Sequence, residues 1–375
     1  MAIVSVITGY IIPFLLVLSF LVFIHEMGHY LVGRWCGIRV TAFSIGFGPE
    51  IVGFTDGHGT RWKLSLIPLG GYVRFLGDED AASRPDLSGA MAQMSEAERA
   101  QTLGGAKLWK RALTVAAGPI ANFVLAILIF AVVFSLYGRM VADPVVAEVR
   151  ADSAAQAAGV AVGDRLVALD GREIRTFDDV RRYVSVRPET EIIVTVERAG
   201  QVLDLPMVPK RVDITDQFGN RVELGQIGIV TDEQRGNFRR VTYGPLEAIG
   251  QGFAETGHII SGTFQYLGNI FAGKMSADQI GGPIRIAETT GQVATLGFVA
   301  VLNFAAVISV SLGLMNLFPI PVLDGGHLVL YALEAVRGRP LSERLQETVF
   351  RIGFALLLTL MVFATWNDTI GRWIG

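Results

Sequence analysis

The chain has 375 residues, of which 51% are hydrophobic and only 18% are charged. This composition is too apolar for an ordinary soluble enzyme and indicates a membrane protein. The net charge is only -3, and no cluster of Lys and Arg of the kind that binds phosphate backbones is present, which argues against a nucleic-acid partner. The single cysteine, Cys36, excludes an internal disulfide and a cysteine-type zinc site, and we interpret it as a small packing residue.

Four apolar runs are long enough to cross a bilayer as helices, which takes about 20 residues. They cover residues 3–24, 112–137, 296–318 and 349–366. No Lys or Arg precedes the first run and no small-residue cleavage site follows it, so we expect it to be retained. Residues 256–273 are uncharged but rich in Gly, Ser, Thr and Gln, and we expect an interfacial or surface helix there.

Basic residues flank these runs on one side only. Arg34 and Arg39 follow the first run, Lys107, Lys110 and Arg111 precede the second, and Arg337, Arg339 and Arg344 lie between the third and the fourth. The positive-inside rule makes this side cytoplasmic. Both termini and the long segment 138–295 are then expected outside the cytoplasm.

The segment between the first two runs predicts a small sheet beside the membrane. Residues 60–67 and part of 70–77 alternate polar and apolar, with Asp56-Gly57 as a turn. An exposed edge of this sheet would suit pairing with an unwound substrate strand, and a plain hairpin packed on the helices fits the pattern equally well. The polar stretch 78–101 indicates a loop with one exposed helix.

The sequence FLVFIHEMGHYLVGRW, residues 20–35, places His25, Glu26 and His29 in an apolar run. On a helix, two histidines four residues apart project from the same face, so both rings can reach one ion. This HExxH spacing is typical of zinc peptidases, in which the imidazoles bind zinc and the glutamate is the general base toward water. Within a span each ionisable residue costs roughly 2.5–3.5 kcal/mol, so such residues persist only if paired, metal-bound or facing a cavity.

A catalytic zinc site needs a third protein ligand. Asp324, in NLFPIPVLDGGH (residues 316–327), is the best candidate because the predicted topology puts it at the same membrane face as the histidines. Aspartate is one methylene shorter than glutamate, so its backbone must approach closely, which flanking Gly325 and Gly326 permit. We expect His327 on the surface or behind the ligands.

Other interpretations stay open from the residues alone. The histidines could be core residues bonded to Glu26. The chain could also be an ion or proton transporter, because the helix broken at Pro319 and Pro321 is of a kind that transporters use. A third possibility is a catalytically inactive membrane scaffold that presents a soluble binding domain.

HEMGH, AAGPIAN and LMNLFPIPVLDGGHL together resemble the site-2 protease family of intramembrane zinc metalloproteases, most closely its bacterial sigma-E-regulating branch. The resemblance runs nearly end to end and includes residues 46–49, 67–73 and 280–287. It implies zinc ligands His25, His29 and Asp324, with Glu26 as catalytic acid and base. It also implies that Asn316 and Pro321 lie near the site, where the asparagine helps to hold the substrate backbone.

From Pro144 the pattern predicts a soluble domain with the element order β, α, β, α, β, β. Residues 159–171 look like a PDZ helix and strand. Residues 224–230 resemble the carboxylate-binding loop of a circularly permuted PDZ domain, with Gly225, Ile227 and Gly228 as substrate contacts, although the two glycines also fit an ordinary turn. Relatives carry two tandem PDZ domains, whereas this segment has room for about one.

The expected fold is therefore a polytopic α-helical membrane protein with four spans, a small membrane-associated β-sheet and an inserted α+β PDZ domain. The expected parts are residues 1–137, 138–235 (PDZ domain), 236–295 (linker and surface helix) and 296–375. The resemblance implies a bacterial inner-membrane enzyme with its active site near the cytoplasmic face and its PDZ domain in the periplasm. Its implied substrates are single-span membrane proteins such as an anti-sigma factor, or remnant signal peptides.

Overall fold

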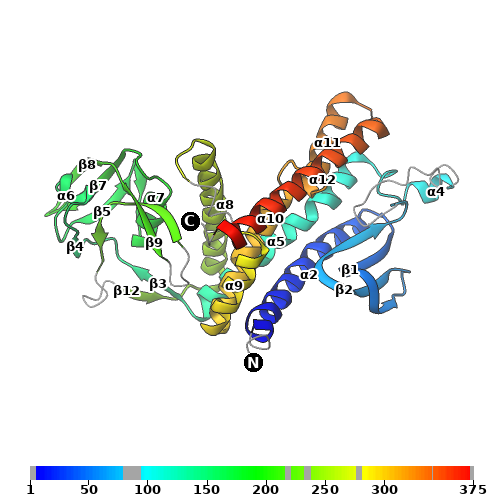
Figure 1. Ribbon diagram of the computed structural model, residues 1–375, viewed down its shortest axis with the longest axis horizontal. Coiled ribbons are helices and arrows are strands. Elements are labelled where there is room, and N and C mark those ends of the chain that lie inside the picture. Colours follow the sequence, from blue (N-terminus) through cyan, green and yellow to red (C-terminus); the bar gives the residue numbers. More distant parts are fainter. Residues whose placement is uncertain are drawn as a thin grey trace. The chain divides into compact units, whose positions relative to one another are not determined.

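The computed structural model describes residues 6–78, 94–215, 221–231, 238–275, 281–339 and 341–371. The chain forms two compact units (Figure 1). The first contains residues 1–129 and 281–375, and the second contains residues 130–280.

Four helices among the described residues are long and apolar enough to cross a membrane: Ile7–Trp35, Leu108–Leu136, Phe298–Asn316 and Arg344–Thr369. They correspond to η1 (Ile7–Ile11) with α2 (Ile12–Trp35), α5 (Leu108–Leu136), α10 (Phe298–Asn316), and α12 (Glu343–Trp366) with η3 (Asn367–Gly371). This confirms the prediction of four spans. The first helix is longer than expected, because it continues through the HExxH motif to Trp35.

Glycines bring the membrane helices of the first unit close together. A Cβ at Gly28 of α2 would collide with the carbonyl of Ala117 in α5, and a Cβ at Gly313 of α10 would lie 3.0 Å from the carbonyl of Pro119. Small residues allow this close approach of helix backbones. Pro119 does not interrupt α5, which runs through it as one helix. A further helix, α9 (Pro283–Thr295), packs against η1, α2, α10 and α12.

The predicted small sheet is an antiparallel hairpin of β1 (Val40–Thr55) and β2 (Arg61–Phe75), which contacts α2 (Figure 1). The two strands expected at 60–67 and 70–77 are continuous in β2, but the two halves pair on opposite sides of the same part of β1, since Ser44 pairs with both Lys63 and Tyr72. Its partner β1 was not recognised in the sequence, because Gly46 and Gly48 have positive φ and bulges shift the register repeatedly. A bulge breaks the alternation by which a strand is recognised. In the predicted loop, α4 (Glu96–Arg99) is exposed, and residues 79–93 lie outside the described residues.

In the second unit the predicted order of elements is present. It consists of β4 (Glu148–Val149), α6 (Ala154–Ala157), β5 (Arg165–Leu169), α7 (Phe177–Ser185), β7 (Ile192–Arg198) and β8 (Gln201–Met207). A short strand, β6 (Arg172–Glu173), completes a sheet of order β6-β5-β7-β8. The core is apolar and includes Leu166, Leu169, Ile192 and Val194. The pattern did not predict the hairpin of β9 (Lys210–Thr215) and β10 (Arg221–Gln226), or β11 (Ile229–Val230), which pairs with β4.

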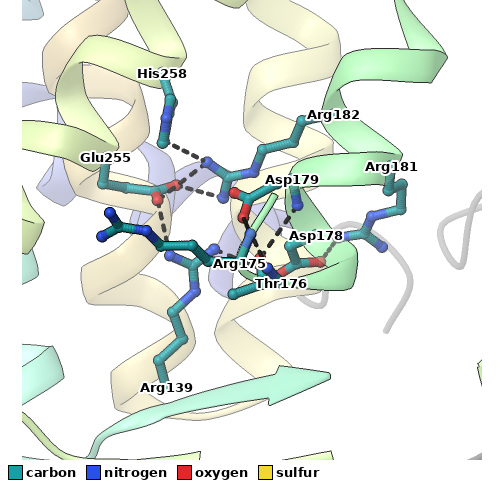
Figure 2. Close-up of polar contacts among 9 residues, drawn as sticks. All are labelled: Arg139, Arg175, Thr176, Asp178, Asp179, Arg181, Arg182, Glu255 and His258. Atoms are coloured by element: carbon teal, nitrogen blue, oxygen red, sulfur yellow. Dashed lines mark hydrogen bonds and ion pairs between the residues drawn. The ribbon is translucent and has the colours of Figure 1, made fainter. Parts of the chain in front are cut away.

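Helix α8 (Pro245–Phe271) packs on this unit through a cluster of ion pairs (Figure 2). Glu255 bonds to Arg182 of α7 at 2.7 Å and to Arg139 at 3.3 Å. Arg139 begins β3 (Arg139–Ala142), which pairs with β12 (Phe238–Val241). The opposite face of α8 exposes large apolar side chains, namely Leu246, Ile249, Phe253, Phe264 and Phe271. Residues 256–273 were expected to form a surface helix, and α8 is indeed not among the candidate spans.

Candidate active site

The HExxH histidines are buried on one face of α2. Their Nε2 atoms lie 3.2 Å apart, and their rings meet edge to face. Each ring is held from its other side by α5, because the carbonyl of Thr114 lies 2.9 Å from Nδ1 of His29 and the side-chain amide of Asn122 lies 3.1 Å from Nδ1 of His25. Both Nε2 atoms are therefore directed toward the same point.

Asp324 reaches this point from the C-terminal segment of the first unit, residues 281–375. Its Oδ2 lies 3.1 Å from Nε2 of His25 and 3.5 Å from Nε2 of His29. Asp324 is the first residue of α11 (Asp324–Arg337), after a loop in which Val322 has a φ of 91°. A β-branched residue rarely adopts such a conformation, and strain of this kind is concentrated at functional sites.

The glycines after Asp324 allow its close approach, as the sequence predicted. A Cβ at Gly325 would collide with the carbonyls of Leu317 and Phe318, and a Cβ at Gly326 would lie 2.5 Å from the carbonyl of Ile320. The first turn of α11 is therefore packed on the backbone of the loop that precedes it. This packing leaves Asp324 directly opposite the histidine pair.

A cavity of about 470 Å³ opens at these three residues. Glu26 and Asn316 line it, as does the β2 segment Gly70–Val73. A Cβ at Gly71 would lie 3.3 Å from Cγ of Glu26, so the strand passes directly beside the catalytic candidate. His327 also lines the cavity, with its ring 5.1 Å from that of Phe350.

The donor set fits a zinc ion. One ligand atom from each of His25, His29 and Asp324 lies within 4.8 Å of the others. Oδ2 of Asp324 is buried and lies near both ring nitrogens, yet it has no hydrogen bond of normal geometry. Two imidazoles and one carboxylate are a donor set that zinc accepts in catalytic sites, which keep a fourth position open.

The other predicted site residues do not line this cavity, although Pro321 directly precedes Val322, which does. Pro321 is not among the residues that line the cavity. It packs closely against Gly353 of α12, where a Cβ would collide with it. Gly225, Ile227 and Gly228 belong to the second unit. Ile227 is part of its core, and Gly228 has a φ of 83° and lies against Ser153. Cys36 is buried, as expected of a packing residue.

Sequence reasoning missed the role of α5 in the site. AAGPIAN was used only as part of the family resemblance, whereas the structure brings Gly118 and Asn122 against the histidines. A signal was available, because a polar asparagine within a membrane run needs a partner and an adjacent glycine marks a close approach.

Comparison with known proteins agrees with this geometry. The model of peptidase family M50 matches residues 13–360, and the chain belongs to this family. A candidate zinc metalloprotease of Agrobacterium fabrum is 69% identical over 98% of this chain and 97% of that protein. Another of Rhizobium meliloti is 64% identical over 96% of each chain. The metalloprotease MmpA of Caulobacter vibrioides is 40% identical over 96% of this chain and 94% of that protein.

These findings confirm the resemblance to the site-2 protease family, which is family M50, and with it the predicted class of enzyme. The chain is a zinc metallopeptidase with helices long and apolar enough for a multi-pass membrane protein.

Proposed function

We propose that the protein cleaves peptide bonds within transmembrane segments, with zinc held by His25, His29 and Asp324. The observation that carries this proposal is the convergence of two nitrogens from the first span and one carboxylate from the start of α11, which follows the third span. All three contributing side chains are largely buried, in a chain whose long helices are apolar. Zinc bound there supplies Lewis-acid chemistry, polarising the scissile carbonyl and activating water.

Glu26 is the general base and acid of this scheme. Its carboxylate takes the proton of the attacking water and returns it to the leaving amine. Its position on α2, one residue after His25 and beside Gly71 of β2, supports this role. Asn316, at the end of α10, holds the substrate backbone in the same cavity.

The substrate backbone must be exposed before it can be cut, since all amides of a membrane helix are hydrogen-bonded internally. We propose that the unwound segment pairs with the β1–β2 hairpin along the Gly70–Val73 part of β2. Gly70 and Gly71 line the cavity together with Glu26, which supports pairing of a substrate strand at this place. Water reaches the cavity from the cytoplasmic side, where the three basic clusters lie according to the positive-inside rule.

The second unit acts as a single PDZ domain outside the cytoplasm. Its element order, and the left-handed Gly228 between β10 and β11, support this assignment. In such a domain the backbone of the loop holds a terminal carboxylate, or the domain excludes substrates with bulky outer parts. The substrates suggested by the family resemblance are single-span proteins trimmed outside the membrane, such as an anti-sigma factor, and remnant signal peptides.

The proposal is tested by Glu26→Gln in the purified full-length protein, with a reporter transmembrane helix as substrate. Cleavage should fall by at least about 100-fold, because general acid–base catalysis contributes roughly that much or more, while bound zinc stays at the wild-type level. Glu347→Gln, which changes an exposed carboxylate on α12, is the control and should cleave normally. Unchanged cleavage by Glu26→Gln would remove Glu26 from the mechanism.

A further inference from the structure

We infer that Asn122 is a positioning residue for the metal site, and that its side-chain oxygen accepts a hydrogen bond from His25 and fixes the tautomer of that ring. This inference rests on the proposed function, since it takes His25 to be a zinc ligand through Nε2.

Both histidines must carry their proton on Nδ1. Their Nε2 atoms point at each other and at Oδ2 of Asp324, so Nε2 is the ligand atom in both rings. A neutral imidazole that binds a metal through one nitrogen bears its proton on the other. Nδ1 of both rings is therefore a hydrogen-bond donor.

The partner of His29 satisfies this requirement directly. Nδ1 of His29 lies 2.9 Å from the carbonyl oxygen of Thr114, which can only accept. The partner of His25 is the side-chain amide of Asn122, whose nitrogen lies 3.1 Å from Nδ1, while its oxygen is buried and has no hydrogen-bond partner among the described residues. An amide presents either an oxygen or an NH₂ group, and a half-turn of the side chain exchanges the two ends. With the proton on Nδ1 of His25, the oxygen must face the ring.

Asn122 is well placed to hold the ring still. Its side chain is fully buried, and its backbone carbonyl accepts a hydrogen bond of 2.8 Å from Ser309 of α10. A Cβ at Gly313 of α10 would lie 3.3 Å from Cβ of Asn122. The residue is thus fixed between the helix that carries the histidines and the helix that leads to Asp324. A residue so confined orients His25 without touching the metal or the substrate.

The test is zinc affinity, measured by competition with a chelator on the full-length protein in detergent. Asn122→Leu, which is close in size and cannot accept, should weaken binding roughly 10- to 100-fold, the usual effect of losing such a partner. Asn122→Ala also removes the acceptor and should weaken zinc binding by a similar factor. It serves as the test if leucine does not fit at this position. Asn122→Asp loses the amide, as Asn122→Leu does, but it keeps an acceptor. Its zinc affinity should therefore stay at the wild-type level.

Ser309→Ala is the matched control, because it removes the hydrogen bond to the backbone of Asn122 and leaves the amide and His25 intact. Its affinity should stay within about twofold of wild type, as expected when the ligand's own partner is untouched. The inference is overturned if Asn122→Leu and Asn122→Ala bind zinc as tightly as wild type, if Asn122→Asp is as weak as they are, or if Ser309→Ala loses zinc equally. His25→Ala distinguishes a failure of the Asn122 inference from a failure of the proposed function. Wild-type zinc affinity in that variant would refute the proposed metal site itself.

Discussion

Gly118 of α5 lies so close to His29 of α2 that a side chain at this position would overlap Nε2 of the imidazole. The same Cβ would lie 2.9 Å from Nε2 of His25. Glycine at 118 therefore leaves open the space into which both ring nitrogens point. In Gly118→Ala the methyl group should push the rings apart, and zinc affinity, measured by chelator competition, should fall by at least about 10-fold.

Gly9→Ala is the matched control for this change. Gly9 lies in η1, at the start of the membrane helix that carries the histidines, and a Cβ there would meet nothing within 4 Å. Since alanine favours a helix over glycine by up to about 1 kcal/mol, neither variant should lose helix stability through propensity. Equal zinc affinity in Gly118→Ala and the wild type would contradict the crowding inferred at the histidines.

Asp56 ties the hairpin to the histidine-bearing helix. It accepts hydrogen bonds from Nε1 of Trp62 at 2.9 Å and from the hydroxyl of Tyr30 at 3.2 Å, which together with the backbone of Thr60 lower its pKa to about 2. In Asp56→Ala the β1–β2 amides should exchange with solvent roughly fivefold to tenfold faster, about the effect of one lost hydrogen bond. Cleavage should also fall in this variant, because the loosened strand β2 lines the cavity.

His58→Ala is the comparison for this variant. His58 lies in the same turn and uses only its backbone N–H toward Asp56, so removing its imidazole leaves every bond to the carboxylate in place. Amide exchange measured by mass spectrometry should be the same in His58→Ala and wild type. Equal protection of β2 in Asp56→Ala would show that the core around Phe43 alone holds the hairpin on α2.

The membrane part of the fold could be predicted from the sequence because apolar length is a strong and local signal. The four spans follow from it, and the i, i+4 spacing placed His25 and His29 on one face. The predicted topology put Asp324 at the same membrane face as the histidines. The structure places its carboxylate 3.1 Å from His25. Helix ends were less accurate, since α2 continues past the polar motif to Trp35.

What the sequence did not reveal depends on contacts between segments far apart in the chain. The strand β1 was missed because bulges at Gly46 and Gly48 disturb its alternation. Asn122 and Thr114 act on histidines about 85 to 97 residues away, through an amide and a backbone carbonyl. No local pattern marks a carbonyl as a partner, so this part of the site needed the structure.

Glu255 should determine how firmly α8 is held within the second unit. Figure 2 shows its carboxylate between Arg182 of α7 and Arg139 of β3. Glu255→Ala leaves both partly buried cations without this partner, and we expect local opening of α8 to become easier by roughly 1–3 kcal/mol. Hydrogen exchange of the α8 amides measures this. Glu247→Ala removes an exposed carboxylate from the first turn of the same helix and should leave α8 protection unchanged, and similar exchange in both variants would contradict the role of Glu255.

The stability of the second unit should decline in acid because of Asp164. Hydrogen bonds of 2.7 Å from Arg198 lower the pKa of this carboxyl group, whose side chain is only 1% exposed. A pKa that is lower in the folded state makes the unfolded state bind protons first as the pH falls. The contribution is therefore complete above the ordinary aspartate pKa of about 4, and it is lost as the pH drops below that value toward the folded pKa.

Hydrogen exchange of the β5 and β7 amides in the full-length protein, followed from pH 7 to pH 3, measures this loss after correction for the intrinsic exchange rate. Asp164→Asn should lower the free energy of opening by roughly 1.5–3 kcal/mol at pH 7 and should flatten its dependence on pH below 4, because the charged hydrogen bond is gone. Asp213→Asn, which removes an exposed carboxylate of β9, should keep the wild-type pH profile. A wild-type profile as flat as that of Asp164→Asn would exclude Asp164 as the source of acid sensitivity.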